Sequence, residues 1–68
     1  MDHEIEYGII RDKIAEYYER LNIEVQVDVE YRNLNWFEAT ATYTDKRLGL
    51  VKAHYTVLLK DGHRVEFQ

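Results

Sequence analysis

Four carboxylates and one imidazole have the spacing that comes closest to a chemical site in this 68-residue chain. They stand at alternate positions of strand-like segments, so one face of a β-sheet would carry them all. The set is Asp28, Glu30, Glu38, Glu66 and His54. Such groups can hold a divalent cation or form an acid–base pair. An open sheet face gives no burial to shift their pKa values, so a solvated acidic face is the preferred interpretation.

The composition excludes most other kinds of catalytic site. The chain contains no cysteine and no serine, so the two commonest side-chain nucleophiles and any disulfide are absent. His3, His54 and His63 are far apart and form no zinc-binding spacing. The three glycines are dispersed, which excludes a phosphate-binding loop. We therefore expect no catalytic residues, no metal site, no cofactor and no enzymatic activity.

A second candidate is a binding surface around the single tryptophan. If the strands pair as their alternation predicts, Trp36 lies opposite Leu58 with Arg32 and Arg64 beside them and Leu34 in the adjacent turn. Tryptophan and arginine are enriched in interface hot spots, and an apolar patch rimmed by charge marks a docking surface. Two alternatives stay open. Arg32 could stack over Trp36 as a cation–π lid, or the pair could stack against single-stranded nucleic acid.

The net charge of the chain indicates which kinds of partner it is suited to bind. The net charge is −4, whereas nucleic-acid binders usually carry a basic surplus, so nucleic acid is a disfavoured partner. Lys46, Arg47 and Lys52 form a small basic cluster that is typical of a solvated loop. No apolar run approaches the roughly 20 residues of a membrane span, and the first residues are acidic where a secretory leader is basic. We expect a cytoplasmic protein with no membrane contact.

An N-terminal helix is predicted over residues 3–21. Its apolar residues recur at steps of three and four and form one stripe. The stripe consists of Tyr7, Ile10, Ile14, Tyr17, Tyr18 and Leu21. Asp2 is the expected N-cap and Asn22 the expected end. Ile5 and Ile9 lie off the stripe, either as scattered surface residues or facing a partner.

Strands are predicted over residues 23–31, 36–44, 50–59 and 63–68, with odd-numbered apolar residues facing inward. Paired residues on antiparallel strands share a face, so their numbers sum to an even value and each loop has an odd length. We expect loops over residues 33–35, 45–49 and 60–62, with Asn35 and Gly62 left-handed. The predicted outward rows are Arg32–Trp36–Leu58–Arg64, Glu30–Glu38–Thr56–Glu66 and Asp28–Thr40–His54–Gln68.

The sequence therefore predicts a single α+β domain over residues 1–68, with one helix on one face of a four-stranded antiparallel meander. This topology resembles the cystatin-like arrangement. The glycine-ended inhibitory loop and the Pro-Trp hairpin of that family are absent, so no residue roles follow from the resemblance. The predicted function is a small acidic protein-binding module, such as an inhibitor of a larger complex encoded by phages or mobile elements. The alternatives are a self-associating homodimer, a single-strand nucleic-acid binder, or a metal or acid–base site.

Overall fold

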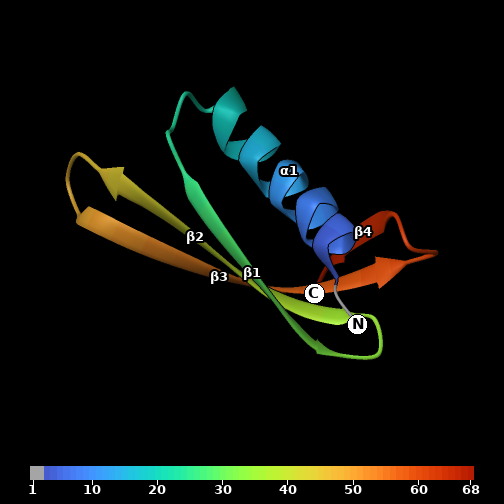
Figure 1. Ribbon diagram of the computed structural model, residues 1–68. Helices are drawn as coiled ribbons and strands as arrows, with labels where there is room; N and C mark the ends of the chain where they lie inside the picture. The colour runs from blue at the N-terminus through green and yellow to red at the C-terminus, as the bar shows by residue number, and fades with distance from the viewer. Residues whose placement is uncertain (1–2) are drawn as a thin grey trace.

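Five elements follow one another in the computed structural model, which describes residues 3–68 (Figure 1). They are α1 (Glu4–Arg20), β1 (Gln26–Asn33), β2 (Trp36–Asp45), β3 (Gly49–Lys60) and β4 (Arg64–Phe67). The strands form one antiparallel sheet in the order β1-β2-β3-β4, and α1 packs on one face of it. The predicted α+β fold, a helix followed by a four-stranded meander, is confirmed.

Helix α1 begins after His3, which occupies the N-cap position. The expected cap, Asp2, lies outside the described residues. The His3 Nδ1 atom is 2.9 Å from a Glu6 carboxylate oxygen, and the ring stacks on Tyr31 of β1 at 3.9 Å between centroids. These contacts fix the first turn of the helix against the sheet.

Helix α1 ends at Arg20, and Asn22, the residue predicted to stop it, adopts a left-handed φ of 58°. The Ile23 N–H donates to the Tyr18 carbonyl and the Asn22 N–H to the Glu19 carbonyl, each at 3.0 Å. This is a Schellman motif, in which the backbone reverses out of the helix. The reversal and the crossing to the sheet use residues 22–25, so β1 begins at Gln26 instead of residue 23.

The core lies between α1 and the sheet and has the inward parity that the alternation predicts. Nine of the described residues are buried: Ile10, Ile14, Tyr18, Val27, Phe37, Ala39, Ala41, Val57 and Leu59. Phe37, Ile10 and Val57 are the largest fully buried side chains, and each such burial stabilises the fold by about 1.5–3 kcal/mol. Ile9 is half-buried against this core, whereas Ile5 is 81% exposed.

The first turn differs from the prediction. Leu34, not Asn35, takes the left-handed conformation, with φ 50°. Tyr31 pairs with Phe37 but Asn33 pairs with Trp36, so Arg32 is an extra residue on β1 and forms a β-bulge. The next turn keeps the expected register, with Asp45 opposite Gly49.

The last turn also differs, because the loop covers residues 61–63 instead of 60–62. Both Asp61 (φ 56°) and Gly62 (φ 75°) are left-handed, and Lys60 pairs with Arg64. The register therefore moves by two residues relative to the prediction. A shift of two preserves the inward parity, so Val65 and Phe67 still face the helix side.

Candidate functional site

The outer face of the sheet, opposite α1, carries the residues that the sequence singled out. Trp36 lies opposite Leu58 and Glu30 opposite Glu38, as predicted. The two arginines are elsewhere than expected. The bulge places Asn33 beside Trp36 in the position predicted for Arg32, and the shifted register gives Leu58 the neighbour Glu66 instead of Arg64.

Trp36, Leu58 and Leu34 together form the outer patch. Trp36 and Leu58 are half-buried, and Leu34 in the adjacent turn is 82% exposed. Within residues 3–68 no other aromatic ring stacks on Trp36. The guanidinium of Arg32 binds carboxylates and does not form the cation–π lid that the sequence left open.

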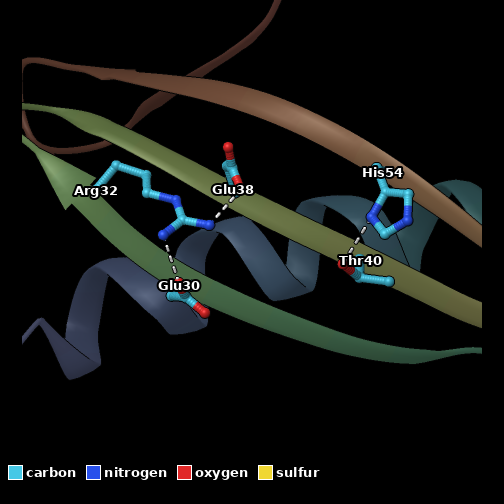
Figure 2. A network of polar contacts seen from close by, with 5 residues as sticks. All are labelled: Glu30, Arg32, Glu38, Thr40 and His54. Carbon is cyan, nitrogen blue, oxygen red and sulfur yellow. Dashed lines mark hydrogen bonds and ion pairs between the residues drawn. The ribbon is translucent and has the colours of Figure 1, made fainter.

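Arg32 bridges the like-charged pair of the first two strands (Figure 2). One guanidinium nitrogen is 2.7 Å from Glu30 Oε1 and the other donates to Glu38 Oε1 at 2.6 Å. This hydrogen bond and the charge of Arg32 hold the pKa of Glu38 below its usual value. Lys60 acts similarly on Glu66, 3.1 Å away, and lowers the pKa of that carboxyl. Glu30, Glu38 and Glu66 thus have cationic partners on the same face.

A shallow hollow of about 280 Å³ lies beside this bridge. Its lining includes Asp28 and the pair Thr40–His54, whose hydroxyl oxygen and Nδ1 atom are 3.1 Å apart (Figure 2). Within the described residues no three His, Asp or Glu side chains converge on a position for a metal ion. The hollow thus presents the Asp28 carboxylate, the Arg32 bridge and the Thr40–His54 pair on one open face.

An inner groove between α1, β3 and β4 was not anticipated from the sequence. It is lined by Lys13, Ile14, Tyr17, Tyr55 and Phe67 and has a volume of about 280 Å³. Tyr17 was predicted as a core residue but is 55% exposed. The helical stripe correctly showed which side of α1 faces the sheet, but it carried no signal for which strands the helix would cover.

The inner groove has an aromatic floor with one hydrogen bond in it. The Tyr18 and Tyr55 hydroxyls are 2.7 Å apart and link α1 to β3. Burial, and secondarily this hydrogen bond, raises the pKa of Tyr18 above its usual range. A second cleft, which we call the hairpin cleft, has a volume of about 580 Å³ and opens between the end of α1 and the β2–β3 turn. Leu21, Tyr43, Lys46 and Arg47 are among its lining residues.

The β2–β3 turn is organised by Asp45. Its Oδ1 atom accepts hydrogen bonds from the Arg47 and Leu48 N–H groups at 2.7 and 3.0 Å. These bonds lower the pKa of the Asp45 carboxyl and hold Lys46 and Arg47 at the tip. Lys52, predicted as part of the same basic cluster, pairs with Thr42 farther along the strands.

No protein-family model, curated protein or solved structure matches this chain. Within residues 3–68 no helix combines the length and the apolar character needed to cross a lipid bilayer.

Proposed function

We propose that this chain is a small non-enzymatic protein-binding module that contacts its partner through the outer patch. The observation that carries the proposal is the conformation of Leu34. A left-handed backbone costs a residue with a Cβ atom about 1–2 kcal/mol. Leu34 adopts it at φ 50°, where the two-residue turn between Asn33 and Trp36 requires a positive φ. Its side chain is 82% exposed, so leucine at this position adds no apolar burial to the folded monomer. Exposed strain of this kind is typical of functional positions.

The neighbours of Leu34 support the same interpretation. Trp36 and Leu58 are directly opposed across β2 and β3, and together with Leu34 they offer an anchor of the type found in hot spots. Arg32 and Lys60 pair with three of the surrounding carboxylates, and because Arg32 is shared by two of them this face keeps a net negative charge. An apolar pocket on a basic protein fits this surface, because the net charge of −4 would steer a basic partner toward it. Inhibition of that partner would follow from occupying its pocket.

The test is affinity capture from host lysate, with and without nuclease, using wild type and two variants as bait. Leu34→Gly relaxes the backbone and removes the exposed side chain, so the fold should be at least as stable as wild type while partner retention falls. Leu48→Ala is the matched control, because it truncates another exposed turn leucine away from the outer patch. A protein retained after nuclease by wild type and Leu48→Ala but lost by Leu34→Gly is the expected result. Equal retention by all three baits, or retention that disappears with nuclease, would contradict the proposal.

A further inference from the structure

The chain exposes more surface than its mass requires. Its accessible area is 5257 Å², whereas a compact monomer of this mass exposes roughly 4,500 Å². Its radius of gyration is 12.3 Å against about 11 Å for a typical domain of this length. The excess, roughly 700 Å², is close to the ~800 Å² that each partner buries in a standard protein–protein interface.

Part of the exposed apolar surface lies on the inner face of the sheet, beside α1. The sheet has four strands only where β4 pairs with Val57–Lys60, and there, at a spacing of about 4.8 Å, it is roughly 19 Å wide. One helix covers about 10 Å of this width, and beyond β4 the sheet narrows to three strands. Helix α1 packs mainly along β1, and the β2–β3 hairpin diverges from the helix toward its tip (Figure 1). The uncovered strip runs from the inner groove, along the β3 side of α1, to the hairpin cleft.

The uncovered strip is apolar and largely aromatic. Phe67 contacts Tyr55 with 5.6 Å between ring centroids, and Tyr18 contacts Tyr43 at 5.1 Å. With the Tyr18–Tyr55 hydrogen bond, these contacts connect the floor from β4 to the hairpin cleft. Tyr17 and Leu21 stand along the helix side of the strip and are 55% and 52% exposed.

Three cationic side chains stand along the strip, and two carboxylates, Glu24 and Asp45, share the hairpin cleft with two of them. Lys13 lines the inner groove, and Lys46 and Arg47 line the hairpin cleft. Within residues 3–68 none of these three side chains forms an ion pair. The Asp45 carboxylate in that cleft is engaged by backbone N–H groups, and Glu24 lies in the connection between α1 and β1. Free cations beside an apolar floor complement a segment that carries carboxylates beside an apolar stripe.

We propose that the inner groove binds an acidic amphipathic helix of a partner protein. The apolar stripe of that helix would cover Tyr17, Tyr55 and Phe67, and its carboxylates would meet Lys13 and the cations of the hairpin tip. A second copy of this chain fits less well, because a two-fold axis would bring the same flank of α1 against itself and place the two Lys13 side chains together. The site is separate from the outer patch and does not depend on it.

The proposal is tested with a displayed library of helical peptides about 16 residues and 24 Å long, in which the apolar stripe and the flanking charges are randomised. We expect enriched peptides to carry an i, i+3, i+4, i+7 apolar stripe flanked by Asp and Glu. Failure to enrich any peptide, or enrichment of basic flanks, would overturn the proposal.

Two charge-reversal variants on the same helix locate the site. Lys13→Glu should weaken the selected peptides by about tenfold or more, because it places a carboxylate at the rim of the inner groove. Arg11→Glu is the matched control and should leave the affinity nearly unchanged, since Arg11 is exposed and does not line the groove. Equal loss in both variants, or loss in Leu34→Gly, would place the peptide elsewhere. Sedimentation showing a dimer that excludes the peptide would assign the groove to a second copy. These outcomes do not depend on whether the outer patch binds a partner, so the two proposals can fail separately.

Discussion

Arg32 accounts for most of the electrostatic character of the outer face. Glu30 and Glu38 are directly opposed on neighbouring strands, where like charges destabilise a sheet. The bulge displaces Arg32 from the regular ladder, and its guanidinium reaches both carboxylates. The carboxylates are thereby engaged in maintaining the sheet, which favours binding over acid–base chemistry at this position.

Replacing Arg32 should therefore change the acid stability of the fold. The pKa of Glu38 is lower in the folded state than in the unfolded chain, so its contribution is present above the usual glutamate range and is lost as the pH falls through the lowered value. In Arg32→Gln the pKa of Glu38 should rise, and the corresponding loss of stability on acidification should shrink. Side-chain NMR titration gives the pKa, and urea unfolding at neutral and acidic pH gives the stability.

The matched control for Arg32 is Lys60→Gln. It should raise the pKa of Glu66, which Lys60 lowers, and leave Glu38 unchanged. A Glu38 titration that is identical in wild type and Arg32→Gln would show that the bridge does not persist in solution.

At the scale of the elements, the sequence predicts faces better than turns. Alternation has a period of two, so it determines that Val65 and Phe67 face inward but cannot distinguish two registers that differ by two residues. The tripeptide at the first turn predicted Asn35 as left-handed on intrinsic preference. The structure places Leu34 there and adds the bulge at Arg32. Both departures fall beside the candidate site, at the turn that joins β1 to β2.

Gly8 is the residue of α1 with the lowest helix propensity. It lies inside the helix, and a Cβ atom added there would meet nothing within 4 Å. Gly8→Ala should stabilise the fold by about 0.5–1 kcal/mol, because alanine loses less backbone entropy in a helix. The measurement is the midpoint of urea unfolding monitored by circular dichroism.

Gly62→Ala is the control for Gly8→Ala. Space is also open at Gly62, but its φ of 75° strains any residue with a Cβ atom, so this variant should be destabilised by about 1–2 kcal/mol. Destabilisation by Gly8→Ala would mean that the glycine has a role beyond the helix itself.

At the scale of the whole molecule, one helix leaves the β3 side of the inner face partly uncovered. The predicted stripe and the predicted inward parity are both correct, yet Tyr17 and Phe67 remain exposed because α1 follows β1. No periodicity in the sequence encodes that lateral position. A core of nine buried residues leaves a marginal fold, of roughly 0.05–0.15 kcal/mol per residue. Any ligand of the inner groove would then raise the stability by mass action.

Among residues 3–68, the Tyr18–Tyr55 hydrogen bond is the only side-chain hydrogen bond between α1 and β3. It therefore links the docking of the helix to the stability of the whole domain. Burial keeps Tyr18 neutral and raises its pKa, so its contribution is present below the usual tyrosine pKa of 10.0 and is lost as the pH rises above it. Because a small domain unfolds as one unit, ionisation of this side chain should unfold helix and sheet together.

The variant Tyr18→Phe removes both the hydrogen bond to Tyr55 and the ionisable hydroxyl, and the two effects are seen at different pH. At neutral pH the variant should lose about 1 kcal/mol, the usual net value of one hydrogen bond. Above pH 10 it should lose less stability than wild type, because no buried hydroxyl ionises at this position. Tyr17→Phe is the neighbouring control, since Tyr17 is exposed and its hydroxyl takes no part in the Tyr18–Tyr55 hydrogen bond. The measurement is thermal unfolding of the three proteins from pH 7 to 11. If wild type and Tyr18→Phe lost stability at the same alkaline pH, Tyr18 would not determine the alkaline stability of the fold.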